Sequence, residues 1–219
     1  MKSKFIIVFL ILTFNLSSLN FTAAEEFNFN TTELQILENG NILKGINGGE
    51  INTKNNEIVI RADNFEYNKL TTLLKAKGNV RLIDKIADII IETNEIVYLK
   101  NKEEIYTKGK SKTLKGKHLQ IDAIQYFKYN KITSLLEAKG NVVLNEKNKN
   151  ITIYTNEILY LMNEEKISSL GKTNINVEDK YNIEGNNLIL LKDKMVLSSK
   201  KSAIITDSES NTYKLEQFQ

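Results

Sequence analysis

Apolar and polar residues alternate along most of the chain beyond residue 24. From Leu74 to Leu82, "LKAKGNVRL", the odd positions of the stretch are Leu, Ala, Gly, Val and Leu, with polar residues between them. The stretch 119–129 alternates in the same way, and the short segments "YNKL" (67–70) and "YNKI" (129–132) separate such stretches as turns. A period of two is typical of strands with one buried and one solvated face. The pattern predicts an all-β chain without helices beyond residue 24.

The alternation belongs to an internal repeat of 31 residues, seen most directly where "LLKAKGNVRL" (73–82) recurs as "LLEAKGNVVL" (135–144). Equivalent residues form columns at this spacing. These are Gly78, Gly109, Gly140 and Gly171; Phe65, Ile96, Phe127, Ile158 and Ile189; Tyr67, Tyr98, Tyr129, Tyr160 and Leu191; and Leu43, Leu74, Ile105, Leu136 and Ile167. A fixed period indicates a structure built from repeated units. We expect about five units of two antiparallel strands each.

The alternation slips by one residue inside three of the predicted strands. The apolar residues Ile58 and Ile60 stand at even positions, whereas Phe65 and Tyr67, later in the same stretch, stand at odd positions. The same shift occurs near 94–95 and 156–157. A slip of one residue would turn the following side chains to the other face of the sheet. Bulges at 63–64, 94–95 and 156–157 would restore them and bend the strands. Bent strands favour a curved, V-shaped sandwich, that is, an open β-jelly roll.

The first 24 residues have the pattern of a secretory signal peptide. Lys2 and Lys4 precede an apolar run, and small residues at 23–24 suit cleavage there. We expect a short extension over residues 25–33 and one β-jelly-roll domain over residues 34–219. Without Lys2 and Lys4 the basic residues fall from 30 to 28 against 27 acidic ones, so charge gives no support for nucleic-acid binding.

Candidate catalytic chemistry is sparse. The chain has no cysteine, and its one histidine, His118, is expected at the surface beside Lys117. No set of nucleophile, acid and base converges, so we predict no enzyme activity, no metal and no cofactor. The lysine-rich stretch 108–117 has two interpretations, a contact for phosphates of an anionic ligand or a solvated loop.

The uniform aliphatic inner face also has two interpretations. It is either a core filled by its own side chains or a trough whose two walls separate and hold hydrocarbon. In the second case the inward positions would contact acyl chains. They are Ile58, Ile60, Phe65, Tyr67, Leu74, Val80, Leu82, Ile89, Ile91, Ile96, Tyr98, Ile105, Ile121, Phe127, Tyr129, Leu136, Val142, Leu144, Ile151, Ile153, Ile158, Tyr160, Ile167, Ile189 and Leu191.

One motif resembles a known family. Ala62-Asp63-Asn64-Phe65-Glu66-Tyr67 is followed by Leu74-Lys75-Ala76-Lys77-Gly78-Asn79-Val80, and the motif recurs without the Asp through 127–142. The chain thus resembles the OstA-like β-jelly rolls of the lipopolysaccharide transport proteins, namely LptA and the N-terminal domain of LptD. The likeness extends from about residue 34 to the last residue.

The resemblance implies a periplasmic conduit at the outer membrane that shields lipid A acyl chains during lipopolysaccharide transport. It implies lipopolysaccharide and neighbouring jelly-roll domains, joined edge to edge, as partners. An LptD-like chain, whose C-terminal edge would continue into an outer-membrane barrel with its plug lipoprotein, is the first expectation. The absence of the cysteines that link the two parts of many LptD proteins departs from that pattern. There are two alternatives. One is a free-standing LptA-like bridge, and the other is a structural β-repeat protein with a packed core and no lipid ligand.

Overall fold

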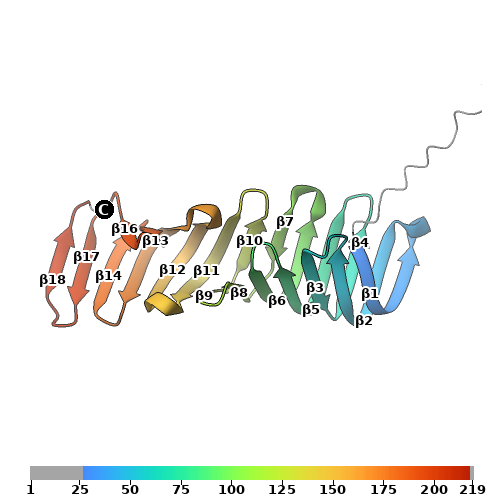
Figure 1. The fold of residues 1–219 in the computed structure, drawn as a ribbon, viewed down its shortest axis with the longest axis horizontal. Coiled ribbons are helices and arrows are strands. Elements are labelled where there is room, and N and C mark those ends of the chain that lie inside the picture. Colours follow the sequence, from blue (N-terminus) through green and yellow to red (C-terminus); the bar gives the residue numbers. More distant parts are fainter. Residues whose placement is uncertain (1–26, 218–219) are drawn as a thin grey trace, which may run out of the picture.

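The computed structural model describes residues 27–217 and shows an elongated, all-β molecule (Figure 1). The expected signal peptide, residues 1–24, lies outside the described residues. The 18 strands form one antiparallel sheet, which confirms the predicted fold class. The helical residues of the described chain are single 3-10 turns between strands, η1 (Glu38–Gly40), η2 (Lys100–Lys102), η3 (Lys147–Lys149) and η4 (Met162–Glu164).

The strands follow one another along the molecule in chain order. They are β1 (Phe27–Leu37), β2 (Ile42–Thr53), β3 (Ile58–Ala62), β4 (Asn64–Asn68), β5 (Leu73–Asp84), β6 (Ile89–Leu99), β7 (Glu104–Thr107), β8 (Ser111–Lys115), β9 (Leu119–Ala123), β10 (Tyr126–Asn130), β11 (Leu135–Glu146), β12 (Ile151–Leu161), β13 (Lys166–Val177), β14 (Tyr181–Asn186), β15 (Ile189–Leu191), β16 (Val196–Ser198), β17 (Ala203–Asp207) and β18 (Thr212–Leu215).

Several of these strands are halves of one long strand that is interrupted at its centre. β3 and β4, for example, pair with the two ends of β2 and again with the two ends of β5. The pairs β7/β8, β9/β10, β14/β15 and β16/β17 are related in the same way. The long strands therefore form a meander, in which each pairs with the one before it and the one after it.

The interruptions align across the sheet and divide it into two halves, which we name wall A and wall B. Wall A contains 27–31, 49–53, β3, 80–84, 89–93, β8, β9, 142–146, 151–155, 173–177, β14, β17 and β18. Wall B contains 33–37, 42–45, β4, 73–77, 95–99, β7, β10, 135–139, 157–161, 166–170, β15 and β16. One face of both walls is buried although no further layer covers it, so the sheet folds along the interruptions and the walls cover each other.

The fold line explains why the "AKGN" phrase is repeated. Gly78 and Asn79 both have positive φ (79° and 48°), and so do Gly140 and Asn141 (89° and 42°). The pairing register shifts at these residues, where 78–79 stand opposite residue 94 alone and 140–141 stand opposite residue 156 alone. The extra residue therefore lies in β5 and β11, and not at 94–95 and 156–157 as expected. Two consecutive residues in the left-handed region turn the strand, and Gly and Asn tolerate this region best. The alanine two residues before each glycine lies opposite Phe65 or Phe127, where a small side chain leaves room for the ring.

Replacing Gly78 with alanine is expected to destabilise the fold more than replacing Gly171. Both glycines have a positive φ (79° and 85°), so both alanines incur about 1–2 kcal/mol of backbone strain. A Cβ on Gly78 would lie 2.3 Å from Oδ2 of Asp63, which also accepts a 2.9 Å hydrogen bond from Asn79, whereas a Cβ on Gly171 would meet nothing within 4 Å. Urea unfolding of the two variants measures the difference. Equal losses would contradict a packed corner at Gly78.

The inward positions predicted from the alternation are buried, with two exceptions. Ile189 and Leu191 are only half-buried, and Leu188 and Leu190 point inward in their place. The repeat is one residue short here, because two residues separate Gly185 from Leu188 whereas three separate their counterparts Ala123 and Phe127.

The start of the domain also differs from the expected boundary at residue 34. Residues 27–33, which we expected to form an extension, belong to β1. The ring of Phe27 packs edge-on against Tyr67 and Tyr98, with centroids 5.0 and 5.8 Å away. This first strand therefore contributes to the core.

Candidate functional site

The interior between the walls is filled by side chains over most of the molecule. Phe127, for example, is 0% exposed, and so are Leu74, Leu144 and Ile158. Along this part the structure matches the packed core rather than an open trough.

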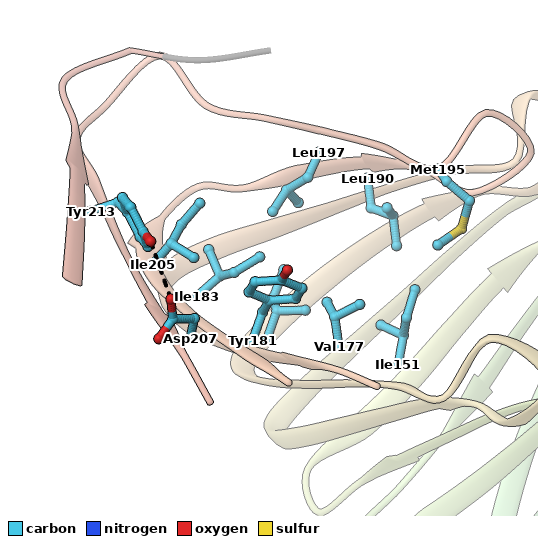
Figure 2. Close-up of a pocket in the computed structure, with 11 residues that line it drawn as sticks. Ile151, Val177, Tyr181, Ile183, Leu190, Met195, Leu197, Ile205, Asp207 and Tyr213 are labelled. Carbon is cyan, nitrogen blue, oxygen red and sulfur yellow. Dashed lines mark hydrogen bonds between the residues drawn. The ribbon is translucent and has the colours of Figure 1, made fainter. Parts of the chain in front are cut away.

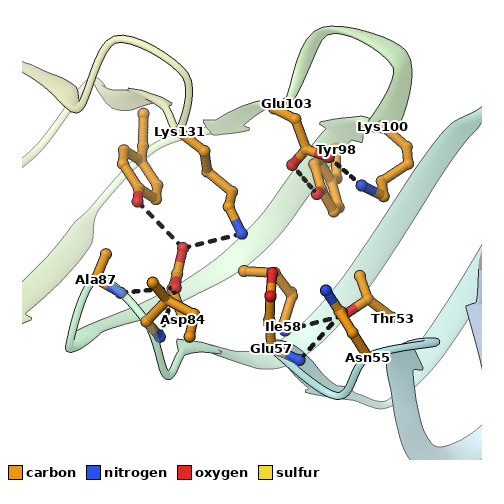
Figure 3. A network of polar contacts seen from close by, with 12 residues as sticks. Thr53, Asn55, Glu57, Ile58, Asp84, Ala87, Tyr98, Lys100, Glu103 and Lys131 are labelled. Carbon is orange, nitrogen blue, oxygen red and sulfur yellow. Dashed lines mark hydrogen bonds and ion pairs between the residues drawn. The ribbon is translucent and has the colours of Figure 1, made fainter.

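A buried ionic link joins the two walls in the middle of this packed part. Asp84, at the end of β5 in wall A, is fully buried and lies 3.3 Å from the amine of Lys131, which follows β10 in wall B. Its carboxylate also accepts hydrogen bonds from the Tyr129 hydroxyl at 3.1 Å and from the backbone N–H groups of Ile86 and Ala87 (Figure 3). Burial, followed by the negative charge of Asp84, raises the pKa of Tyr129. The tyrosine therefore remains a neutral donor.

A second ionic link stands 62 residues further along the chain, the length of two repeat units. Glu146, at the end of β11 in wall A, is 2.9 Å from the amine of Lys192, which follows β15 in wall B, and that amine is 3.0 Å from Glu165. Glu165 also accepts a 2.9 Å hydrogen bond from the Tyr160 hydroxyl. Burial lowers the pKa of Lys192, but its hydrogen bonds to Glu146 and Glu165, together with the negative charges of the two carboxylates, outweigh burial and raise this pKa overall. We call Glu146, Lys192 and Glu165 the inner cluster.

Beyond the inner cluster the walls separate and leave an apolar groove of about 510 Å³ (Figure 2). Ile151 and Met195 lie at one end of it, and Asp207 and Tyr213 lie at the other. The remaining lining residues are Ile175, Val177, Tyr181, Ile183, Leu190, Leu197 and Ile205. Asp207, the charged residue of the lining, accepts a 3.1 Å hydrogen bond from Tyr213. A groove with this lining suits a hydrocarbon chain, because such a ligand gains affinity from buried area rather than from hydrogen bonds.

The column of residues that carries the links changes character where the groove begins. Asp84 and Glu146 occupy equivalent positions, and the next residue in the column, 31 residues after Glu146, is Val177. Val177 cannot form an ionic link to wall B, and it lines the groove. The groove therefore begins beside the last charged residue of this column.

Only Ile151 among the predicted acyl-chain contacts lines this groove. The other predicted residues lie in the packed interior or, for Ile189 and Leu191, outside it. The remaining lining residues were missed, although continuing the columns would have found two of them. Ile175 is 31 residues after Leu144, and Ile183 is 62 residues after Ile121.

Two lysines of the stretch 108–117 are engaged by other parts of the chain. Lys108 is ion-paired with Glu95 at 3.0 Å, and Lys115 donates a hydrogen bond to the carbonyl of Ala87. His118 is exposed in the turn after β8, as expected. Within residues 27–217 no group of three or more His, Cys, Asp or Glu is placed to hold a metal ion. No helix in this same part of the chain has the length and apolarity to span a membrane.

The two ends of the sheet each present an edge. Among the described strands, β1 pairs only with β2, and β18 pairs only with β17. They stand at opposite ends of the elongated molecule (Figure 1). Each edge leaves backbone N–H and C=O groups that a further strand could pair with.

Comparison with known proteins finds a distant likeness to solved structures. No family model matches the chain, and no curated protein matches it either. A solved structure that resembles it is the crystal structure of LptH, described as the LptA homologous periplasmic component of the conserved lipopolysaccharide transport device from Pseudomonas aeruginosa. The two share 12% identity with a TM-score of 0.29, over 74% of this chain and 95% of that one. So distant a likeness does not decide the function, which has to be argued from the groove.

Proposed function

We propose that the chain is a lipid-binding module of the OstA-like type, which holds acyl chains of lipopolysaccharide in the groove between its walls. The observation that carries the proposal is the apolar groove beside the inner cluster, lined from both walls. The motif of the sequence, with its doubled "AKGNV" phrase, adds support from family resemblance. The corresponding role is to bind the lipid and pass it on, and not to catalyse a reaction.

The partners and location follow from the same proposal. The export pattern of residues 1–24 supports a place in the periplasm, and the family resemblance adds the outer membrane as the destination. The two edge strands suit neighbouring jelly-roll domains joined by strand pairing. This proposal has two versions. One is an LptD-like chain, with an outer-membrane barrel and its plug lipoprotein as further partners. The other is an LptA-like bridge.

The proposal is tested by a pair of neighbouring substitutions in β17. Ile205 lines the groove, whereas Ile204 is 41% exposed on the opposite face of the strand. Native mass spectrometry of the mature protein with lipopolysaccharide should give a one-to-one complex. Ile205→Glu should abolish this complex because it places a charge among apolar side chains, and Ile204→Glu should leave it intact.

A structural role without a ligand is the second candidate, because the interior is packed along most of the molecule. In that case neither lipopolysaccharide nor a phospholipid would form a complex with the folded wild-type protein. Equal loss of binding in Ile204→Glu and Ile205→Glu would also contradict the groove as the site.

A further inference from the structure

The inner cluster borders the groove on both walls. On wall A, Glu146 lies directly opposite Ile151 in the strand register, and Ile151 lies opposite Val177, so the two lining residues are one and two strands away from Glu146. On wall B, Lys192 comes two residues after Leu190 and three before Met195, which both line the groove. Figure 2 shows Ile151 and Met195 at the same end of the groove, far from Tyr213. The cluster therefore lies at the inner end of the groove.

Several polar contacts hold the walls together at this point. Besides the ion pair of Glu146 with Lys192, the amine of Lys149 in wall A donates a hydrogen bond to the carbonyl of Lys192. The backbone N–H of Lys192 donates to the carbonyl of Glu165 at 2.9 Å, which fixes the lysine within wall B. Past the cluster, toward the middle of the molecule, Leu119 and Ile121 of the neighbouring strand β9 are buried. No room continues inward behind it.

We propose that the inner cluster sets the length of the apolar chain that the groove accepts. This inference rests on the proposed function, since it concerns the ligand of the same groove. The side chain of Glu146 is 2% exposed, so a hydrocarbon chain that pushed past it would leave a carboxylate without its amine and without water. Separating a buried ion pair costs far more than burying one further methylene returns. The ligand chain therefore stops at the cluster, and longer chains gain nothing from their extra carbons.

The test uses lysophosphatidylcholines with saturated chains of increasing length, offered to the full mature protein below their micelle concentrations. For the wild type, affinity should rise about fourfold per methylene, since each buried methylene contributes a fixed free energy. It should then level off at one chain length. In the double variant Glu146→Ala/Lys192→Ala, which removes both charges and leaves space beside Ile151, affinity should continue to rise over roughly two further methylenes or more.

The chain supplies a matched control. Asp84→Ala/Lys131→Ala removes the equivalent ion pair from the packed interior, far from the groove, and should leave the levelling length at the wild-type value. If Glu146→Ala/Lys192→Ala levels off at the wild-type length, or if the control shifts it equally, the inference is overturned while the groove remains a lipid site. If the wild type binds none of the series although it forms the complex with lipopolysaccharide, the inference is overturned and the proposed function stands. If it binds neither lipid, both fail.

A second variant covers loss of folding in the alanine pair, judged by far-ultraviolet circular dichroism. Glu146→Gln/Lys192→Met keeps the side-chain volumes and removes only the charges, a change that buried ion pairs often tolerate. Affinity for chains just above the wild-type limit should rise in this variant, because its walls are no longer held together by the ion pair at the inner end of the groove. Unchanged affinity for those chains would overturn the inference.

Discussion

Asp84→Ala is expected to lower the free energy of unfolding by about 3–5 kcal/mol, because it leaves a mostly buried amine without its counter-charge. The carboxylate of Asp84 joins wall A to wall B through Lys131 and Tyr129, and it also accepts two backbone N–H groups of its own turn. All of these donors lose their acceptor together. Urea unfolding monitored by circular dichroism measures the loss.

Asp88→Asn is the matched control for this substitution. Asp88 is exposed in the same turn, with a φ of 53° that asparagine tolerates, so its loss of charge should change stability by less than about 0.5 kcal/mol. A double variant, Asp84→Ala/Lys131→Met, should recover part of the stability lost by Asp84→Ala, since it removes the orphaned amine. Two equally small effects for Asp84→Ala and Asp88→Asn would mean that the link does not hold the walls together.

Phe127→Ala is expected to cost a similar amount, about 3–5 kcal/mol, as is typical when a buried phenylalanine is truncated. The ring is fully buried and lies opposite Ala138 in the register, so no larger neighbour can fill the space that it leaves. Lipid binding by the variant that remains folded should be unchanged, because Phe127 does not line the groove. Thermal unfolding and the lysophosphatidylcholine series measure the two quantities on one preparation.

These two measurements separate the two interpretations of the inner face. If Phe127 contacted acyl chains in an open trough, its truncation would weaken lipid binding and cost little stability. Leu70→Ala, at a turn position that is 75% exposed, should change neither quantity and serves as the control.

Much of the fold could be predicted from the sequence, because alternation and the 31-residue columns both report one buried face. The columns through Phe65 and Leu74 identified inward positions. The parity slips located the register shifts near residues 94 and 156, although the extra residues lie in the partner strands, at 78–79 and 140–141. The prediction of inward positions was wrong at Ile189 and Leu191, because one missing residue shifts the repeat there. A column extrapolated past a deletion assigns every later side chain to the wrong face.

The site was harder to predict, because periodicity shows which side chains point inward but not how far apart the walls stand. Wall separation depends on contacts between residues 45 or more positions apart, such as Tyr129 with Asp84 and Lys192 with Glu146. These acidic residues stand at strand ends among many other charged residues, and nothing local distinguishes them. Their equivalence becomes visible only when they are compared across two repeat units.

The meander has a consequence for the reach of such molecules. Each long strand contacts mainly the strand before it and the strand after it, and residues 85–146 repeat the plan of the residues before them. Duplicating that segment would insert four long strands without altering either end. At about 4.8 Å per strand, the molecule would lengthen by about 19 Å. In this architecture the distance that a protein can bridge therefore depends on the number of its repeats.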